Sequence, residues 1–204
     1  MTMPDWTTPP SLRGGHVALE PLSTAHADGL REAVEDGRLY DIWYTNVPAA
    51  KEVDAYIDGA LAKQAKGEQL AFVVRDAGGR VVGTTRYYEL TPEVPRLQIG
   101  YTWYAASVQR TGLNTEAKLL LLGHAFDALR CASVGLQTSW FNLASRAAIA
   151  RLGAKEEGIT RNHVRHRDGT LRDTVNFSIL DTEWACVKRN LLARLAHHAT
   201  GHAK

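Results

Sequence analysis

The sequence has few cysteines and no long apolar run. Cys131 and Cys186 are its 2 cysteines, with no C-x-x-C pair and no short cysteine–histidine spacing, which excludes a disulfide framework. Both flank or lie in predicted helices, and we expect both thiols to be buried. No apolar run reaches the ~18 residues of a membrane span. The first residues also lack the layout of a signal peptide, so we expect a cytoplasmic protein with no membrane partner.

The sequence also lacks an excess of charge. It has 24 Lys and Arg against 22 Asp and Glu, a net charge of +2, so it offers no basic field for nucleic acid. Its 204 residues, 45% of them hydrophobic, are enough for one domain with a buried core. We expect a flexible arm over residues 1–13, a single domain over 14–196 and a polar tail over 197–204.

Metal-ligand patterns are missing as well. His163 and His166 are three residues apart on a predicted strand, which places them on opposite faces. His198 and His202 have i, i+4 spacing but lie in the polar tail. We therefore expect no metal site.

Neither G-x-x-x-x-G-K-[ST] nor G-x-G-x-x-G occurs, which argues against an ATP, GTP or dinucleotide loop. The chain contains instead a strand, a glycine turn and a helix between Leu97 and Arg130. A strand is predicted because Leu97, Ile99, Tyr101 and Trp103 alternate with smaller or polar residues, which places these four on one face. A polar turn, residues 109–115, precedes a helix predicted from Thr115. Such a helix N-terminus leaves backbone N–H groups free at the positive end of the helix dipole, which favours a phosphate.

This turn resembles the acyl-CoA loop of the GNAT N-acyltransferases, whose pattern is Gln/Arg-x-x-Gly-x-Gly/Ala. Here it reads Gln109-Arg110-Thr111-Gly112-Leu113-Asn114. Asn114 stands where the family usually has glycine or alanine. Asparagine tolerates left-handed backbone, so we expect the loop geometry to be kept.

A second segment, residues 139–154, resembles the N-x-x-S-x-x-A-I-x-x-L-G-A-x-x-E-G signature of the ribosomal-protein-alanine (RimJ/RimL-type) branch of that family. Asn142 is the expected N-cap, and Gly153 the expected end, of a helix there. Asn-Thr-Glu-Ala-Lys at 114–118 and Asp-Gly-Thr-Leu-Arg-Asp at 168–173 stand in the family's order. The resemblance extends over about residues 14–195 and identifies the chain as a member of the family.

The fold expected from these patterns is α/β (α+β) and GNAT-like: a mixed, mostly antiparallel central sheet with one central βαβ unit and helices on both faces. The predicted strands are residues 16–22, 69–75, 81–88, 97–104, 132–138, 160–166 and 172–180. The predicted helices follow Ser23 or cover residues 51–66, 115–130, 142–152 and 181–195.

The resemblance implies that acetyl-CoA is the acyl donor, its pantetheine arm lying between strands 97–104 and 132–138. A backbone N–H near Trp103 or Tyr104 would then meet the thioester oxygen. The residues expected to contact the donor are Trp103, Tyr104, Gln109, Arg110, Thr111, Gly112, Leu113, Asn114, Thr115 and Asn142.

The resemblance also bears on the leaving thiolate. Many GNAT members have a tyrosine acid seven residues after the capping asparagine, but Ile149 stands there and cannot donate a proton. The Rim-type branch implies Ser145 instead, as a hydrogen-bond donor to sulfur. Ser145 and Asn142 are therefore the expected catalytic residues. The alternative is that Ser145 only occupies the first helical turn, where serine is common.

A strong general base is missing from the pattern. Family members often have a carboxylate in the strand that here carries Gln98. Deprotonation at neutral pH costs about 1 kcal/mol for an α-amine and about 4.6 kcal/mol for lysine, so a site without a base suits an α-amine. Water-mediated bases remain open at Glu116, Glu157, His163 and Asp173.

We therefore predict an N-acetyltransferase that acts on a primary amine, an α-amine of a protein N-terminus or of a small molecule. The alternative is a non-catalytic acyl-CoA or CoA-binding module. The aromatic segment 39–48 either closes the edge of the core or lines the acceptor groove. The identity of the acceptor is not encoded in a readable pattern, and both a monomer and a homodimer remain open.

Overall fold

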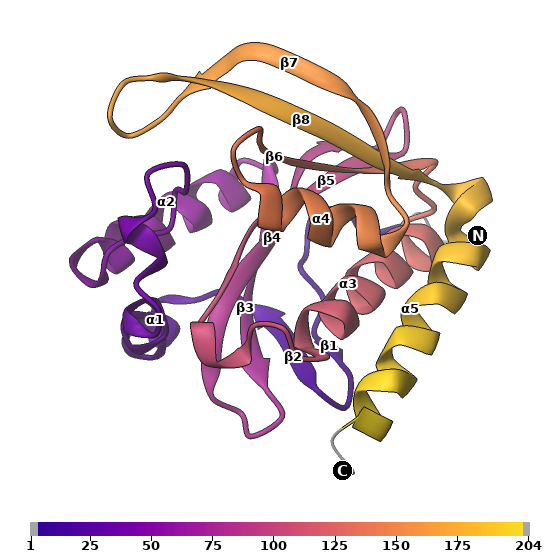
Figure 1. The fold of residues 1–204 in the computed structure, drawn as a ribbon, viewed down its shortest axis with the longest axis horizontal. Coiled ribbons are helices and arrows are strands. Elements are labelled where there is room, and N and C mark those ends of the chain that lie inside the picture. Colours follow the sequence, from indigo (N-terminus) through magenta and orange to yellow (C-terminus); the bar gives the residue numbers. More distant parts are fainter. Residues whose placement is uncertain (1–3, 202–204) are drawn as a thin grey trace.

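The computed structural model describes residues 4–201, with side chains described up to residue 198. Its strands form one eight-stranded sheet in the order β1-β2-β3-β4-β5-β6-β8-β7 (Figure 1). Every neighbouring pair is antiparallel except β5 and β6, which are parallel. The strands are β1 Leu12–Arg13, β2 Val17–Pro21, β3 Gln69–Asp76, β4 Val81–Thr91, β5 Arg96–Tyr104, β6 Ser133–Ser139, β7 Lys155–Arg165 and β8 Leu171–Leu180.

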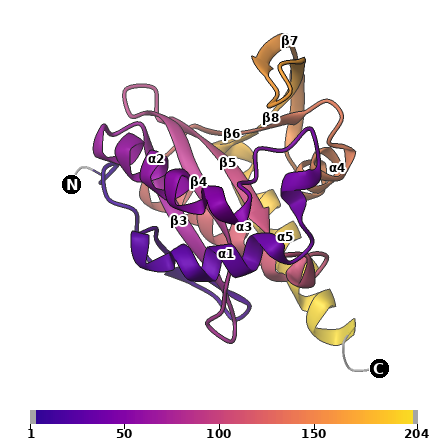
Figure 2. The ribbon, with the colours of Figure 1, turned by 90° about the vertical axis from the view of Figure 1, so that its left-hand side faces the viewer.

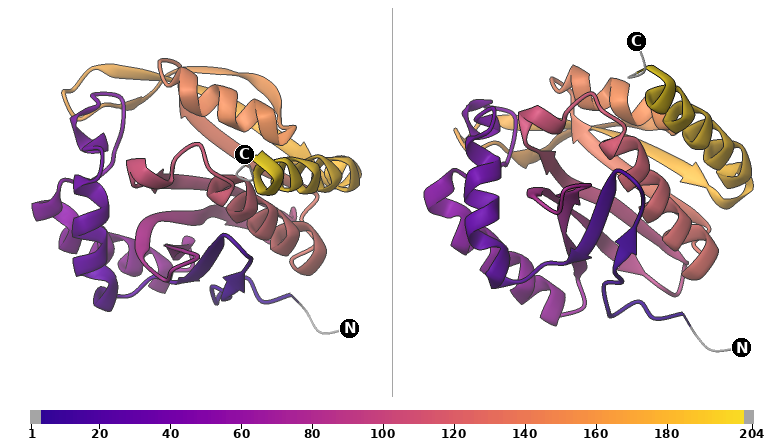
Figure 3. Two further views of the ribbon diagram at one scale, coloured as in Figure 1. Left: turned by 60° about the horizontal axis from the view of Figure 1, so that its bottom comes forward. Right: turned by 90° about the horizontal axis from the view of Figure 1, so that it is seen from below.

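Helices cover both faces of this sheet. The first pair, α1 and α2, lies on one side, and α3 and α5 lie side by side on the other (Figures 2 and 3). The fifth helix, α4, packs against β6 and α5. The helices are α1 Ala27–Glu35, α2 Val53–Ala65, α3 Leu113–Gly123, α4 Leu143–Leu152 and α5 Asp181–Gly201, and a π-helical turn, His124–Ala128, extends α3.

The predicted fold class is confirmed, since β5, α3 and β6 form the expected parallel crossover inside a mostly antiparallel sheet. The ends of the domain differ from the expectation. Leu12 and Arg13, placed by the sequence in a flexible arm, pair with β2 as a short edge strand. The helix α5 continues through residues 197–201, which we expected to be a polar tail. Residues 202–204 lie outside the described residues.

A bulge in β5 corrects the predicted alternation. Thr84 lies opposite Trp103 and Arg86 opposite Gly100, so β5 carries one residue more than β4 between these pairs. Tyr101 is in the left-handed region with φ of 51°. A bulge reverses the faces that follow it. Leu97 and Ile99 are therefore buried against the α3 face, whereas Tyr101 is 44% exposed, so these residues do not share one face.

The core is a single cluster that spans both faces of the sheet. Leu30, Ala33 and Val34 of α1 are buried, as their spacing predicted. Cys131 is also buried, but Cys186 is exposed on α5, which contradicts the expectation for the second thiol. Trp184 and Val187 are buried on the inner side of α5, whereas helical periodicity places Cys186 on its outer side.

Candidate functional site

The two parallel strands of the sheet are paired over only part of their length. The pairing of β5 with β6 runs from Arg96 opposite Ser133 to Ile99 opposite Leu136. Beyond it, β6 continues to Ser139 while pairing only with β8. The strands therefore separate at the bulge. Residues 100–104 and 137–139 face each other's edge without a ladder, and their backbone groups remain available to a bound molecule.

Within the separated part of β5, the backbone N–H of Tyr104 points toward β6. The N–H of Ala105 donates to the carbonyl of Val82 in β4 at 2.8 Å. Successive N–H groups of a strand point to opposite sides, so the N–H of Tyr104 points away from β4. The side chains of Trp103 and Tyr104 are buried, and burial raises the pKa of Tyr104. Of the two expected oxyanion donors, this geometry favours Tyr104.

The predicted acyl-CoA loop follows β5 and leads into α3. Gly112 is the N-cap, with φ of −66°, so the helix begins at Leu113, two residues before its predicted start. Thr111 closes the turn: its hydroxyl donates to the carbonyl of Val108 at 2.7 Å and accepts from the N–H of Leu113 at 3.2 Å.

Two details of this loop differ from the sequence expectation. The left-handed residue is Arg110, with φ of 60°, and not Asn114, which lies inside the first turn of α3 with Thr115. Asn114 therefore replaces the family's small residue at a helical position. Gln109 turns back to the strand, its amide donating to the carbonyl of Tyr104 at 2.9 Å.

The second predicted motif follows β6 and leads into α4. The Oδ1 atom of Asn142 accepts a hydrogen bond from the N–H of Ser145 at 3.0 Å, which confirms the predicted N-cap. The helix ends at Gly153, with φ of 105°, as predicted. The Ser145 hydroxyl makes no hydrogen bond to any residue that the structure describes. Because α3 and α4 follow two parallel neighbouring strands, their N-termini lie at the same edge of the sheet, on the two sides of the gap.

The candidate bases are mostly engaged elsewhere. The Glu116 carboxylate accepts hydrogen bonds from the N–H groups of residues 15, 16 and 17 at 2.5 to 3.0 Å. Asp173 binds the Arg161 guanidinium at 2.6 Å. His163 shares a hydrogen bond of 3.1 Å with the hydroxyl of Thr174. Glu157 is exposed beside a cavity of about 70 Å³ that Gln98 also lines.

Aromatic side chains from three distant segments meet above the gap. The ring of Trp43 lies 5.2 Å from that of Phe141 and 4.9 Å from that of His166. Trp43 and Phe141 are 49% and 56% exposed, so this group does not close the core. The tip of the β7–β8 hairpin is held there by an ion pair of 3.3 Å between Arg167 and Glu52. The arrangement favours the groove interpretation of segment 39–48.

Sequence reasoning missed two buried cations near the bulge. Lys118 of α3 is 5% exposed, and its Nζ donates to the hydroxyl of Thr102 at 2.9 Å. Burial lowers the pKa of Lys118 to about 7. Arg86 of β4 is 4% exposed on the opposite face. Lys118 lies four residues before Leu122 and therefore on the apolar face of α3. This spacing is a signal from which its burial could have been predicted.

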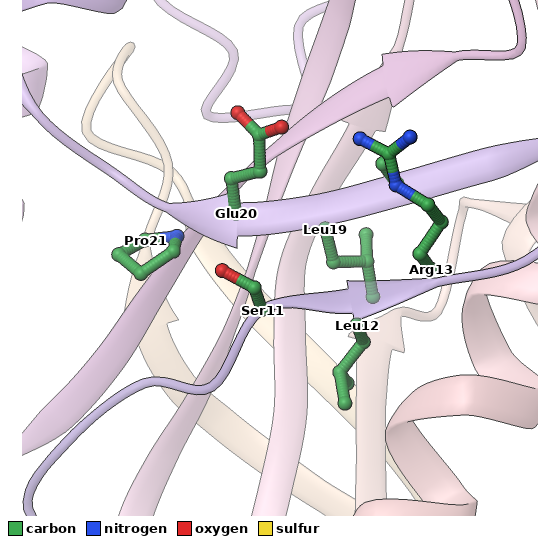
Figure 4. A pocket seen from close by; sticks show the side chains of 7 residues that line it. Ser11, Leu12, Arg13, Leu19, Glu20 and Pro21 are labelled. Carbon is green, nitrogen blue, oxygen red and sulfur yellow. The ribbon is translucent and has the colours of Figure 1, made fainter.

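A pocket of about 390 Å³ lies at the β1–β2 edge, four strands from β5, and contains no predicted site residue (Figure 4). No group of three or more potential metal ligands occurs in residues 4–201. No helix within that range is long and apolar enough to cross a membrane.

Comparison with known proteins gives consistent matches. The profile of a family described as "Acetyltransferase (GNAT) domain" matches residues 16–155. A Bacillus subtilis protein named "Putative ribosomal N-acetyltransferase YdaF" is 31% identical over 106 residues, which are 52% of this chain and 57% of that relative. The chain thus matches little more than half the length of this curated relative.

Solved structures match over most of the chain. A GCN5-related N-acetyltransferase from Brucella melitensis has a TM-score of 0.81 at 30% identity, covering 91% of this chain and 85% of its own. RimJ from Mycobacterium smegmatis, solved in complex with CoA-disulfide, has a TM-score of 0.75 at 25% identity, covering 91% of this chain and 93% of its own.

Proposed function

Because this chain belongs to the GNAT acetyltransferase family, we propose that it transfers an acetyl group from acetyl-CoA directly to a primary amine. The observation that carries the proposal is the end of β5–β6 pairing at Ile99 and Leu136, flanked by the N-termini of α3 and α4. An extended molecule can pair with the exposed strand edges there while its phosphates meet a helix N-terminus. Acetyl-CoA has both parts.

We assign roles to this chain's own groups as follows. The N–H groups of residues 110–115, apart from that of Leu113, which donates to the Thr111 hydroxyl, bind the pyrophosphate at the positive end of α3. The Tyr104 N–H stabilises negative charge on the thioester oxygen during attack by the amine. Ser145 donates a hydrogen bond to the leaving sulfur, and Asn142 holds Ser145 in place as the N-cap of α4.

The acceptor we propose is an α-amine, on a protein N-terminus or a small molecule. In support, Gln98 cannot accept the proton of an ammonium group, and Glu116 and Asp173 are engaged in other contacts. An α-amine loses its proton near neutral pH without a strong base. Relatives named for ribosomal acetylation and RimJ support the Rim-type branch, where such an acceptor is expected.

Thermal unfolding and acetyl transfer test this proposal together. At a hundred times its dissociation constant, acetyl-CoA should stabilise the protein by about 2.7 kcal/mol, whereas ATP and NAD should not. Gly112→Val should abolish this shift because its branched side chain would press on the His16 ring and displace the loop. Gly112→Ala is the matched control, since the φ of −66° suits alanine and its Cβ would lie 3.4 Å from the His16 ring.

Catalysis is separated from binding by Ser145→Ala, which should keep the acetyl-CoA shift and lower kcat for thiol release about tenfold, as expected for one lost hydrogen bond to developing charge. No thermal shift with acetyl-CoA or CoA would contradict the proposal. A shift without amine-dependent thiol release, across a broad panel of amines, would favour the non-catalytic binding module instead.

A further inference from the structure

Arg86 occupies an unusual position in the sheet. Its guanidinium contacts two tyrosine rings, one of them on α2, and α1 and α2 lie together on that face of the sheet (Figure 2). The guanidinium carbon is 4.5 Å from the ring centre of Tyr56 in α2 and 4.5 Å from that of Tyr101 in the bulge. Two aromatic rings therefore lie against the guanidinium, and its remaining N–H donors are left for a further partner.

The hydrogen bonds of Arg86 are incomplete. Its Nη1 donates to the Oε1 of Gln69 at 3.3 Å, and its Nε is buried without any partner. No carboxylate in the described part of the chain lies within ion-pair distance of Arg86. A buried guanidinium without a counter-ion is costly, because it keeps its charge at every physiological pH. The fold therefore holds a cation whose natural partner is an anion from outside the chain.

A second guanidinium, that of Arg172, interacts with one of these tyrosines, Tyr101. The Nε of Arg172 in β8 is also buried without a partner, and burial lowers the pKa of Arg172. Its charge interacts with Tyr88 and Tyr101, whose rings are 5.2 Å apart. The neighbouring carboxylate of Asp173 is already bound to Arg161. Elsewhere, the partly buried Arg75 has the carboxylate partner that Arg86 and Arg172 lack, Glu20 at 2.7 Å.

Tyr101 connects these side chains to the gap between β5 and β6. The Tyr101 ring contacts both the Arg86 guanidinium and the Tyr88 ring. Tyr101 is also the bulge residue at which β5 separates from β6. It is 44% exposed, so it forms the boundary between Arg86 and solvent. Tyr104, whose N–H faces the gap, lies three residues further along the same strand. An anion at the guanidinium edge would thus sit beside the place where the amine must be presented.

We infer that the acceptor carries a carboxylate, which binds in the plane of the Arg86 guanidinium with Arg172 as its second cation. A carboxylate pairs with a guanidinium through two parallel N–H···O bonds in one plane, which matches the fork geometry of the Arg86 donors. The inference rests on the proposed function and narrows its substrate class to amines that bear an acid. The acid belongs either to a free amino acid or to an acidic side chain beside a protein N-terminus.

Acceptors that differ by one acid or amide group provide the test, with kcat/KM expressed per neutral amine, because the α-amine of a free amino acid is more basic than that of its amide. The wild-type protein is assayed with acetyl-CoA and two matched pairs: a free amino acid against its amide, and a peptide Ala-Asp-Ser-Gly against Ala-Asn-Ser-Gly. One acid should exceed its amide in kcat/KM by at least about tenfold, as for a charge-assisted hydrogen bond. Which pair shows the preference identifies the source of the carboxylate. Acetylation with equal kcat/KM within both pairs would overturn the inference and leave the proposed function standing.

Variants connect the preference to the two guanidiniums. Arg86→Gln and Arg172→Gln should each reduce the acid-to-amide ratio to near one while keeping the acetyl-CoA thermal shift. Arg75→Gln, which removes a guanidinium already paired with Glu20, is the matched control and should leave the ratio unchanged. A purely structural role of Arg86 would lower both rates equally, and that result would overturn the inference.

A binding measurement keeps the test independent of turnover and of variant folding. The N-acetylated products of both matched pairs, each acid beside its amide, are titrated into the CoA-loaded wild-type protein by calorimetry. One acid should bind at least about tenfold more tightly than its amide. Equal affinity within both pairs, or no binding of any product, would overturn the inference. Tighter binding of the acid without acetylation of any amine would retain the anion site and reject the proposed transfer reaction.

Discussion

Lys118 and Arg86 are both buried cations beside the β5 bulge, but they lie on opposite faces of the sheet. The Lys118 ammonium reaches a hydrogen-bond acceptor, the Thr102 hydroxyl at 2.9 Å, and burial lowers its pKa to about 7. The Arg86 guanidinium has a buried Nε without a partner and is covered by two rings. The buried Lys118 nitrogen therefore has a hydrogen-bond partner, whereas the buried Nε of Arg86 has none among the described residues.

The difference follows from the chemistry of the two side chains. A lysine can lose its proton and become a neutral amine, so its burial needs no anion. An arginine cannot do so, and its planar fork suits a carboxylate. A buried lysine is therefore weak evidence of a ligand, while a buried and unpaired arginine is strong evidence. Three predictions test this contrast, and each concerns either Lys118 or Arg86.

The largest effect is expected when Lys118 is replaced by a residue that cannot lose its charge. Lys118→Arg should reduce the free energy of unfolding by about 3 to 5 kcal/mol, because the α3 face offers no counter-ion for a fixed charge. Denaturation in urea measures this loss. Lys118→Met is the control of similar length, and it should be as stable as the wild type or more stable at pH 7. Equal destabilisation by both substitutions would show that shape, not charge, governs the position.

An intermediate effect is expected from pH. The pKa of Lys118 is about 7 in the folded state and near its usual 10.5 when unfolded. Between these values the unfolded chain binds more protons, so the free energy of unfolding should rise with pH, by up to about 1.4 kcal/mol per unit. The stabilisation should be fully present above the unfolded pKa and lost below pH 7. The measurement compares how steeply the free energy of unfolding rises with pH in the wild type and in Lys118→Met. Equal slopes would contradict the prediction.

The smallest effect is expected when the unpaired cation is removed. Arg86→Leu should destabilise the ligand-free protein by less than about 1.5 kcal/mol, since the lost contacts with the rings of Tyr56 and Tyr101 are offset by release of an unsatisfied buried charge. Urea denaturation without any carboxylate ligand measures it. A loss above about 3 kcal/mol would assign Arg86 to the structure of the sheet rather than to a ligand.

The sequence anticipated the fold because its signals were local and strong. The alternation from Leu97, the Asn142 cap and the Gly153 stop each indicate an element by short-range chemistry. Together with the acyl-CoA loop they indicated the family, and the match over residues 16–155 confirms it. The contact residues assigned from that resemblance remain predictions.

The errors came from features that no local pattern encodes. Nothing in Gly100-Tyr101-Thr102 distinguishes a regular strand from a bulge, so Tyr101 was assigned to the wrong face. Glu116 fits a helix-dipole residue by position, but the fold brings it to the N–H groups of residues 15–17, about a hundred positions away. Edge pairing of Leu12 with Leu19 likewise depends on a neighbouring strand.

The amino-acid sequence alone determined the order of elements, the parallel crossover and the glycine turn before α3, because periodicity, caps and turn residues act over a few positions. Only the tertiary structure decided where β5 leaves β6 and which charges are left without partners inside the protein. Burial and pairing depend on residues distant in the chain, such as Tyr56, Arg86 and Arg172, which meet only after the sheet and its helices have packed.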